Sequence, residues 1–402
     1  MVRPRRRDVM RETIAILSFS RIARDQRVLR QCDLAARMEL RPKVIGYAAP
    51  GETIGHDFAS WPLPSPTFGH RIGTLARQLP AHLGKTAAMA GFWSSPRYRW
   101  ALKQLREVHP RLVIANDWPA LVVAARWKAE SGGLIHYDSH EFATLEFDER
   151  PWWRFVYKPF VSQLEKAVIG AADSISTIST GLAQELQRQY GLDTQPAVVR
   201  SIPNKHALPL SETQWPLRLL FHGQILPGRG LEGLIDSIPL WHSAHRLIIR
   251  GDGNRTYLEE LRRRAANVST NGQVQFEPAV PPEEVIPAAA RSADVGVFFT
   301  PLQTVQHQFT LPNKLFEYIG AGLAVAVSPG FDLRCLVLEH GIGVVSADAG
   351  SEAIAAAINE LTRQAVDAFR MKAREASQIL CWEQERNRLH SCIETLLTRS
   401  SA

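Results

Sequence analysis

Residues 311–328 read LPNKLFEYIGAGLAVAVS, a short apolar helix, a glycine turn and a buried strand in direct succession. Glu317 is the unexpected member of this stretch, because a carboxylate removed from water costs several kcal/mol unless a charged or hydrogen-bonding group meets it. One reading is a solvated helix face on which Glu317 pairs with Lys314. The other is a carboxylate held for a ligand, and the rest of the sequence bears on the choice.

The same alternation of strand and helix runs through both halves of the chain. Segments that read as buried strands lie at 13–20, 41–49, 112–118, 133–141 and 173–179, and again at 217–223, 245–253, 274–280, 294–301, 323–328 and 343–348. Helical patterns lie at 25–37, 118–130, 155–169, 231–237, 255–266, 283–291, 314–321 and 382–397. Strands that alternate with helices predict parallel, doubly wound sheets.

The length predicts two domains, because 402 residues are too many for one ordinary core. We expect an α/β fold of two Rossmann-like domains that face each other across a cleft and bind ligands at the carboxyl ends of their strands. A stretch rich in proline and polar residues occupies 201–216. The predicted boundaries are 1–205 for the first domain, 206–216 for a linker, 217–381 for the second domain and 382–402 for a C-terminal helix that packs back toward the first.

The composition is that of a soluble cytoplasmic protein. Hydrophobic residues make up 45% and charged residues 22% of the chain, and no apolar run approaches the ~18 residues of a membrane span. The basic N-terminus lacks the apolar core of a signal peptide. The four cysteines are scattered without metal-ligand spacing, which predicts reduced thiols and neither a zinc site nor a disulfide framework.

The net charge of +7 is concentrated in residues 61–111. This segment contains one acidic residue, Glu107, and eight basic ones: Arg71, Arg77, Lys85, Arg97, Arg99, Lys103, Arg106 and Arg111. Six aromatic residues are interleaved with them: Trp61, Phe68, Phe92, Trp93, Tyr98 and Trp100. Such a mixture suits an anionic membrane surface or a phosphate-bearing partner, and it equally suits a solvated face with arginine stems packed on aromatic rings. No motif for nucleic acid accompanies it.

Gly228, Gly230 and Gly233 fit the G-x-G-x-x-G fingerprint, with Asp252 near the position of a ribose-binding acid. The context fits a nicotinamide site poorly, because four residues, including Pro227, separate the strand glycine Gly223 from the loop. The alternative is phosphate capture, in which loop N–H groups at a helix start meet an anion and Arg229 supplies a bidentate donor. A surface arginine in a turn is the third reading.

Several motifs resemble one known family. They are FHGQILPGRGLEGLI, IIRGDG, FEPAVPPEEV, ADVGV and LPNKLFEYIGAGLAVAVS in the second half, with weaker matches at HYDSHEF, ADSISTIS and VVRSIPN in the first. Their order and spacing resemble the retaining nucleotide-sugar glycosyltransferases of the GT-B fold, family four (glycosyl transferases group 1). The resemblance extends over nearly the whole chain.

The resemblance implies a role for particular residues. Glu317 would accept hydrogen bonds from the ribose of a nucleoside-diphosphate sugar, and Arg229, Lys314 and the helix start at 310–314 would face its diphosphate. His140 would lie near the donor sugar, unless it is a helix-start or core histidine satisfied by Asp138 or Glu141. The remaining donor-binding positions would be Gly223, Gln224, Gly251, Asp252, Gly253, Ala279, Val280, Thr310 and Asn313.

The sequence departs from the family pattern at three places. Thr310 stands where relatives often carry a glutamate that engages the sugar, and Gln224 stands where they carry an arginine, a loss for which Lys314 would compensate. The glycine-rich loop after the first strand is replaced by SFSRIARDQR. Its polar side chains, together with one residue after the third strand, are the expected acceptor-side groups: Ser20, Arg21, Asp25, Arg27 and Asp117.

The resemblance therefore predicts a retaining, metal-independent glycosyltransferase that uses a nucleoside-diphosphate sugar as co-substrate and needs no other cofactor. The acceptor would be lipid-linked or a glycan, met at the inner face of the cell membrane during assembly of a surface polysaccharide or glycolipid. Two alternatives stay open, a GT-B sugar-nucleotide epimerase and an inactive nucleotide-sugar-binding protein. The nicotinamide reading is the third.

Overall fold

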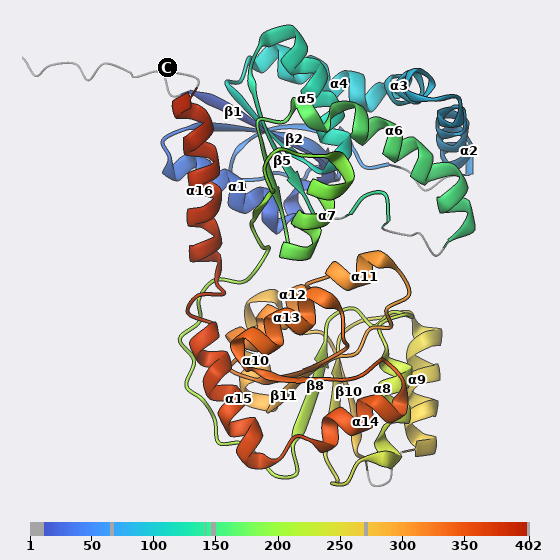
Figure 1. Cartoon of the computed structure of the whole chain (residues 1–402), viewed down its shortest axis with the longest axis vertical. Coiled ribbons are helices and arrows are strands. Elements are labelled where there is room, and N and C mark those ends of the chain that lie inside the picture. Colours follow the sequence, from blue (N-terminus) through green and yellow to red (C-terminus); the bar gives the residue numbers. More distant parts are fainter. Residues whose placement is uncertain (1–11, 65–67, 141, 146–149, 269–271, 400–402) are drawn as a thin grey trace, which may run out of the picture. The chain divides into compact units, whose positions relative to one another are not determined.

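The computed structural model describes residues 12–64, 68–140, 142–145, 150–268 and 272–399. The basic N-terminus, on which the signal-peptide prediction rests, and Glu141 lie outside these ranges. The chain forms two compact units, each with its own sheet (Figure 1). The first unit comprises residues 1–178, 182–199 and 388–402, and the second comprises 179–181 and 200–387.

The first unit contains a seven-stranded sheet with the order β3-β2-β1-β4-β5-β6-β7, in which every neighbouring pair is parallel. The strands are β1 (Thr13–Arg21), β2 (Arg41–Ala48), β3 (Asp57–Pro62), β4 (Leu112–Asn116), β5 (Leu134–Ser139), β6 (Ser174–Thr177) and β7 (Ala197–Val198). Strands β4 and β5 are buried almost throughout, and β1 is buried over residues 14–18, as expected for a parallel sheet covered on both faces.

Helices cover both faces of this sheet because the strand order reverses between β1 and β4 (Figure 1). Right-handed crossovers that run in opposite directions along a sheet place their helices on opposite faces. The helices are α1 (Gln26–Arg37), α2 (Phe68–Gln78), α3 (Lys85–Trp93), α4 (Pro96–Val108), α5 (Asp117–Ser131), α6 (Lys158–Val168), α7 (Thr180–Tyr190) and α16 (Trp382–Arg399), of which residues 382–387 belong to the second unit. Short turns of other helix types are η1 (Ile22–Arg24), η2 (Leu79–Leu83), η3 (Trp153–Tyr157) and η4 (Ile169–Ala171).

The second unit contains a six-stranded parallel sheet with the order β10-β9-β8-β11-β12-β13. The strands are β8 (Arg218–His222), β9 (Arg246–Arg250), β10 (Val274–Glu277), β11 (Val295–Phe298), β12 (Ala324–Val327) and β13 (Gly343–Val345). The order reverses between β8 and β11, and the carboxyl ends at such a reversal are where open α/β sheets bind ligands.

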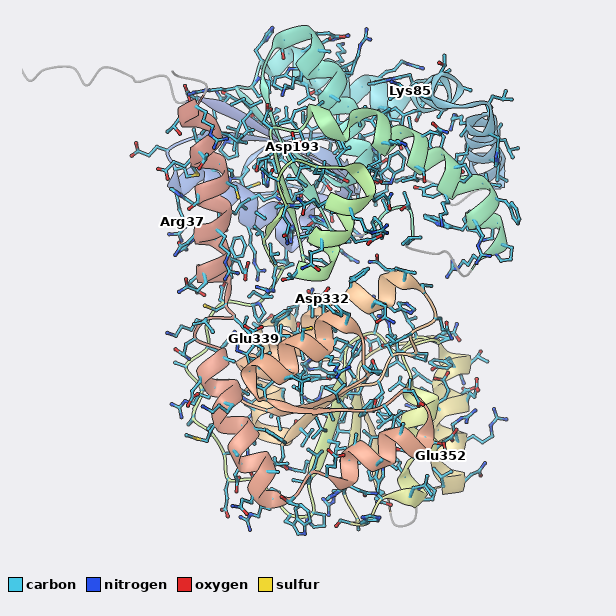
Figure 2. The ribbon with its side chains drawn as sticks, in the orientation of Figure 1. Arg37, Lys85, Asp193, Asp332, Glu339 and Glu352 are labelled. Carbon is cyan, nitrogen blue, oxygen red and sulfur yellow. The ribbon has the colours of Figure 1, made fainter. Side chains whose placement is uncertain are left out.

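The helices of this unit again form two layers. They are α8 (Leu231–Asp236), α9 (Arg255–Val268), α10 (Val285–Ser292), α11 (Val305–Phe309), α12 (Asn313–Gly320), α13 (Phe331–His340), α14 (Ser351–Asn359) and α15 (Arg363–Ala376), with short turns η5 (Ile238–Leu240) and η6 (Pro282–Glu284). Helices α8, α9 and α14 lie on one side of the sheet, and α10, α12 and α15 lie on the other (Figure 1). Charged residues such as Glu352 on α14, and Arg37 in the first unit, are exposed at the outer surface (Figure 2).

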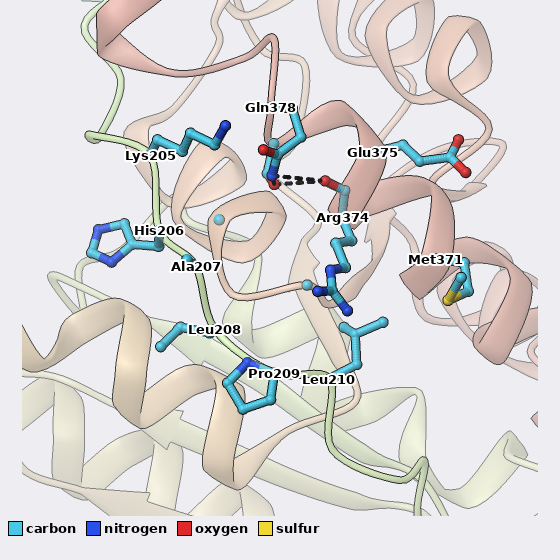
Figure 3. Close-up of a pocket in the computed structure, with 13 residues that line it drawn as sticks. Lys205, His206, Ala207, Leu208, Pro209, Leu210, Met371, Arg374, Glu375 and Gln378 are labelled. Carbon is cyan, nitrogen blue, oxygen red and sulfur yellow. Dashed lines mark hydrogen bonds between the residues drawn. The ribbon is translucent and has the colours of Figure 1, made fainter.

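The segment that we predicted as a linker, 206–216, belongs to the second unit. Arg370 on α15 fixes it, donating hydrogen bonds to Thr213 Oγ1 at 2.8 Å and Ser211 Oγ at 3.0 Å. Part of the segment also frames a hollow of about 660 Å³ together with α15 (Figure 3). Gly320 and Gly322 line this hollow, so it lies at the opposite end of α12 from Lys314.

The predicted fold class is confirmed, since both units are Rossmann-like α/β layers with parallel sheets. The strand predictions coincide with observed strands in both halves. The region that we described by its charge alone, 61–111, contains the end of β3, helices α2, α3 and α4, and η2. These helices extend the layer that covers the sheet beside α5 and α6.

Candidate functional site

Lys314 lies in the first turn of α12, near the strand reversal of the second sheet. Its ammonium group sits 3.7 Å from the ring centre of Phe221 and 5.3 Å from that of Phe298, at the ends of β8 and β11. Burial and the charge of Arg229 lower the pKa of Lys314 to about 7, although Glu317 acts in the opposite direction. Lost hydration and the nearby guanidinium therefore destabilise the ammonium form of this side chain, and an anion beside it would restore that form.

Arg229 approaches Lys314 from the glycine loop before α8. Gly228 and Gly230, on either side, have φ values of +82° and +75°, which a residue with a Cβ rarely adopts. A Cβ on Gly230 would lie 1.8 Å from the carbonyl oxygen of Phe299, so only glycine lets the loop approach the end of β11. Neither Arg229 nor Lys314 forms an ion pair with a carboxylate of the described residues. Two nearby cations without such a partner form a site that favours an anion.

Glu317 faces His222, the last residue of β8. Its Oε2 lies 2.9 Å from His222 Nε2, and the imidazole stacks on Tyr318 with ring centres 4.6 Å apart. The close contact of Glu317 is thus with His222, and the predicted pairing with Lys314 appears as a longer-range effect on the lysine pKa. The Glu317 side chain is 28% exposed, whereas that of His222 is 4% exposed. We refer to Arg229, Lys314, Glu317 and His222 as the cationic site.

The glycines at the ends of β8 and β9 pack backbone against backbone. A Cβ on Gly251 would lie 1.8 Å from the Gly223 carbonyl oxygen, and one on Gly253 would lie 2.4 Å from that of Ile225. Gly223, with φ +111°, leaves room for Lys314, whose Nζ would be 3.5 Å from a Cβ there. The predicted donor positions Gln224, Asp252, Ala279 and Asn313 are exposed, and Val280 is half-buried.

Thr310 follows α11 and closes that helix, since its hydroxyl donates a hydrogen bond to the Gln306 carbonyl at 3.0 Å. Asn313 is the first residue of α12, and no side chain of the described residues caps this helix. The Leu315 N–H donates to the Pro312 carbonyl at 3.0 Å, so the N–H groups of Asn313 and Lys314 are the ones that remain available to an anion. Helix α8 is only six residues long, so the loop glycines contribute more through close packing than through a helix dipole.

A second polar group lies at the carboxyl edge of the first sheet, around the buried carboxylate of Asp138. It accepts hydrogen bonds from Arg27 Nε at 2.6 Å, Gln31 Nε2 at 2.8 Å and Ser176 Oγ at 2.7 Å. Burial opposes its ionisation, but Arg27 and His140 more than compensate and hold the pKa of Asp138 well below its usual range. Gln31 also exchanges hydrogen bonds with Asn116, the last residue of β4.

His140 lies between two carboxylates. Its Nδ1 is 3.4 Å from Asp117 Oδ2 and its Nε2 is 3.4 Å from Asp138 Oδ2, and its backbone N–H donates to Asp117 Oδ1 at 3.1 Å. Burial disfavours the imidazolium, yet the two carboxylates raise the pKa of His140 to about 10. Asp117 itself has φ +63°, a conformation that is rare outside glycine and that recurs at functional sites. We call Arg27, Asp117, Asp138 and His140 the carboxylate cluster.

The other predicted acceptor-side residues are held by local partners. Asp25 caps α1 by accepting from the N–H groups of Arg27 and Val28, both at 3.2 Å, and it also accepts from the Ser20 hydroxyl at 2.5 Å. Arg21 forms an ion pair with Glu52 at 2.7 Å. Within the described ranges, no group of three or more His, Cys, Asp or Glu side chains is arranged to hold a metal ion.

Sequence reasoning placed Arg229 and Lys314 in the cationic site but missed His222. In the first unit it named Asp138 only as a possible partner of His140, and it missed Asn116 and Gln31 beside the carboxylate cluster. A signal for three of them was present, because each is a polar residue inside or at the end of a segment that otherwise reads as a buried strand. His222 ends LRLLFH, Asn116 ends LVIAN and Asp138 lies within LIHYDS. Gln31 carries no such signal, since glutamine is ordinary on an amphipathic helix.

Comparison with known proteins gives a family match in the second unit. Residues 216–364 match the family model of the glycosyl transferases group 1, a range that contains Arg229, Lys314, Glu317 and His222. None of the curated proteins compared with the chain matches it.

Solved structures match nearly the whole chain in fold. HepE from Anabaena, solved in complex with UDP and glucose, has a TM-score of 0.67 and 15% identity, covering 96% of this chain and 100% of its own. The lipopolysaccharide outer core galactosyltransferase WaaB in its apo form has a TM-score of 0.68 and 13% identity, covering 95% and 99%. The sucrose-phosphate synthase from Thermosynechococcus elongatus has a TM-score of 0.71 and 15% identity, covering 97% and 100%. The chain thus has the GT-B fold of two Rossmann-like units, and its second unit matches the group 1 glycosyl transferases.

Proposed function

We propose that this protein is a retaining, metal-independent glycosyltransferase that transfers a sugar from a nucleoside-diphosphate sugar to an acceptor hydroxyl. The observation that carries the proposal is the cationic site. Arg229 and Lys314 lie close enough for one charge to lower the pKa of the other, and neither is paired with a carboxylate among the described residues. Both lie inside the range that matches the group 1 family model.

The cationic site suits the chemistry of a departing diphosphate. As the bond from the anomeric carbon to the diphosphate breaks, negative charge builds on the leaving oxygen. The Arg229 guanidinium, the Lys314 ammonium and the free N–H groups of α12 stabilise that charge in surroundings of low polarity. The proton of the acceptor hydroxyl passes to the leaving phosphate, which remains on the same face of the sugar and so accounts for retention.

Glu317 accepts hydrogen bonds from the two ribose hydroxyls of the donor. A carboxylate can accept from both at once, and the contact with His222 orients it. The nucleoside lies against the glycine-rich ends of β8 and β9, where the backbones of Gly223, Gly251 and Gly253 pack closely. The sucrose-phosphate synthase and HepE are similar only in fold, but HepE was solved with UDP and glucose, so UDP-glucose is the first donor to test.

His140 donates to a sugar hydroxyl in this proposal and does not act as a general base. With a pKa of about 10 it is protonated at neutral pH and has no free lone pair for a proton. The carboxylate cluster keeps it charged and fixes its orientation. The cluster also lies at the carboxyl ends of β4 and β5, the edge at which parallel sheets bind ligands.

We further propose a peripheral position on the inner face of the cell membrane, with a lipid-linked acceptor. No described helix is both long and apolar enough to cross a bilayer. In the first unit, the described large apolar side chains that are exposed, apart from Leu63 just after β3, gather on α2, η2 and the segment that contains η3: Leu75, Leu79, Leu83, Trp152 and Phe155. His82 on η2 contacts the Phe155 carbonyl oxygen at 2.5 Å, which brings the two segments together. We call these five side chains the apolar patch.

The basic residues expected at the membrane divide into two groups. Arg106 pairs with Glu130 at 2.8 Å and Arg111 pairs with Glu12, so acidic residues from outside the segment neutralise part of its charge. Lys85 and Arg99 are exposed without an ion pair among the described residues. The aromatic residues Phe92 and Tyr98 are buried in the core, so the apolar contribution to docking comes from the apolar patch instead.

The test is incubation with a panel of nucleotide sugars, beginning with UDP-glucose, followed by detection of released nucleoside diphosphate. Slow release from one donor, unaffected by EDTA, supports the proposed transferase. Release of an altered free sugar in place of the donor sugar would favour an epimerase. Binding of a donor with no release, even after addition of lipid extracts and glycans, would favour an inactive binding protein.

A further inference from the structure

The first unit contains a small cavity that none of the roles above uses. It has a volume of about 170 Å³ and lies between α2, the α3–α4 junction, the start of α5 and the start of α6. Aromatic rings form much of its wall: Phe92, Tyr98, Trp118, Tyr157 and Phe160. Phe92 and Tyr98 stack with ring centres 3.8 Å apart, and Trp118 packs against Phe160 at 6.0 Å and Tyr157 at 6.1 Å.

Two arginines, Arg77 and Arg97, line the cavity, and none of the carboxylates that the structure describes does. Arg97 Nη2 donates a hydrogen bond to the Tyr98 hydroxyl at 2.7 Å. Its Nε is buried and has no hydrogen-bond partner among the described residues. Neither arginine forms an ion pair with a described carboxylate. A guanidinium with an unsatisfied buried N–H, set among rings that exclude water, costs stability unless an acceptor fills the space.

The cavity lies at the ligand-binding edge of the sheet. Trp118 is the second residue of α5, directly after Asp117 of the carboxylate cluster. Tyr98 packs against Phe19 at 4.9 Å, and Phe19 packs against Tyr47 at 5.8 Å, so the cavity wall is anchored at the carboxyl ends of β1 and β2. Strand β1 borders the reversal of strand order between β1 and β4, where open α/β sheets bind ligands.

We propose that this cavity binds a phosphate group carried by the acceptor. That the phosphate belongs to an acceptor rests on the proposed transferase function. That the cavity binds an anion is argued from the cavity alone. A volume of about 170 Å³ is well below the roughly 300–1,000 Å³ of pockets that enclose a whole ligand, so it accommodates a single charged group while the rest of the acceptor extends outside. Guanidinium groups bind phosphate through paired N–H donors, and the surrounding rings strengthen the attraction by excluding water.

The phosphate could belong to a lipid or to a soluble molecule, and position favours the lipid. Arg77 and Gln78 on α2 line the cavity, and the same helix carries Leu75 of the apolar patch. A phosphate at the level of a bilayer surface would therefore meet the arginines while the patch contacts the lipid. The acceptor class that this arrangement fits is a lipid-linked phosphate or diphosphate whose sugar hydroxyl accepts the transferred residue.

The test uses methyl phosphate as the probe and a full-length protein in which Arg229→Ala and Lys314→Ala remove the cationic site. Binding is followed by broadening of the phosphorus NMR signal. We expect Arg97→Gln and Arg77→Gln each to weaken binding at least tenfold. Arg37→Gln, which removes an exposed charge at the end of α1 (Figure 2), should leave binding unchanged. Equal binding by all variants would overturn the proposal.

Two further comparisons make the result decisive. Arg97→Gln removes a hydrogen bond to Tyr98 and can disturb folding, so its unfolding temperature is measured. If it does not fold, methyl phosphate binding by Arg77→Gln, which loses no assigned hydrogen bond, tests the proposal. Vesicles with phosphatidic acid, which exposes a phosphate monoester, are compared with phosphatidylglycerol vesicles of equal charge. Preference for phosphatidic acid that Arg77→Gln abolishes identifies a lipid source, and methyl phosphate binding without that preference identifies a soluble one. Donor hydrolysis is measured separately, so loss of the transferase proposal would leave the anion site standing.

Discussion

At the scale of single residues, Glu317 tests how the donor is held. We predict that Glu317→Gln weakens nucleotide-sugar binding by roughly 1.5–3 kcal/mol, the value of hydrogen bonds to a charged acceptor. Glutamine keeps the shape of the side chain but cannot accept from two ribose hydroxyls with both oxygens. Calorimetry of donor binding measures the change. Glu339→Gln, on the exposed surface of α13 (Figure 2), is the matched control, and equal affinities in the two variants would remove Glu317 from the site.

Lys314 makes diphosphate binding dependent on pH. Because burial and Arg229 hold its pKa at about 7, the unbound lysine is largely neutral above that pH and must take up a proton when an anion binds. We predict that nucleoside diphosphate affinity falls by up to roughly tenfold per pH unit above pH 7, and that Lys314→Met flattens this slope. Calorimetry at pH 8 in buffers of different ionisation enthalpy measures the proton uptake. Lys205→Met, an exposed lysine of the same unit, should behave like the wild type, and no uptake by the wild type would contradict the prediction.

The shifted pKa of Lys314 also makes the free energy of unfolding depend on pH. Its pKa is lower in the folded protein, at about 7, than the ordinary value of 10.5. Between these values the unfolded chain binds more protons than the folded one, so this group's contribution to the free energy of unfolding rises as pH increases through that window. His140 acts oppositely, since its raised pKa contributes stability that is fully present below pH 6.5 and is lost as pH rises through about 10.

At the scale of elements, the two glycines around Arg229 distinguish two costs of adding a side chain, the strain of a positive φ and the steric clash with neighbouring backbone. Gly228 and Gly230 have similar positive φ values. A Cβ on Gly228 would meet open space, whereas one on Gly230 would lie 1.8 Å from the carbonyl oxygen of Phe299, the residue after β11. We predict that Gly228→Ala lowers the free energy of unfolding by ~1–2 kcal/mol. Gly230→Ala should cost a further ~1–3 kcal/mol because the loop must move away from Phe299. Urea unfolding of the two variants measures the difference, and equal costs would show that the loop can adapt without strain.

The sequence predicted the elements well where one physical signal dominates. Strands such as β4 and β8 are continuous apolar runs, because both faces of a parallel sheet are buried, and such runs are unambiguous when helices alternate with them. Helices α2 to α4 were not predicted, because the arginines and aromatic residues interleaved in this segment obscure its helical period. The packing of the folded unit determines which of these side chains are buried: Phe92 and Tyr98 lie in the core, and the arginines lie at its edge.

The candidate site was predictable for groups with a local pattern and not for groups that meet only in space. Arg229 lies in a glycine loop and Glu317 before a glycine turn, and both patterns are visible in sequence. The pairing of Glu317 with His222 joins residues 95 positions apart and depends on the neighbouring positions of β8 and α12. The depressed pKa of Lys314 likewise depends on burial against Phe221 and Phe298, which no spacing rule indicates.

At the scale of the whole molecule, the apolar patch predicts binding to membranes. We expect the protein to sediment with anionic vesicles at low salt and less at high salt, because each basic residue near the surface contributes about 1 kcal/mol before screening. Leu83→Asp combined with Phe155→Asp should reduce binding at least tenfold, since these side chains are 85% and 67% exposed and can enter the interface.

The control for this prediction is Leu338→Asp, which places the same charge on a leucine that is 58% exposed in the second unit. It should sediment with vesicles as the wild type does. Equal loss in both variants would point to a general effect of added negative charge. No binding of the wild type to anionic vesicles at low salt would exclude the membrane position and leave a soluble acceptor.

The most direct test of the central claim is turnover of the Arg229→Ala variant on the donor that the wild type uses. If Arg229 stabilises charge on the departing diphosphate, its removal should lower turnover by roughly 10²–10³-fold, the range found for removing one such donor. The unfolding temperature should change little, because Arg229 forms no ion pair with a described carboxylate. Arg246→Ala, an exposed arginine at the amino end of β9, should retain full activity. Wild-type turnover by Arg229→Ala would contradict the account.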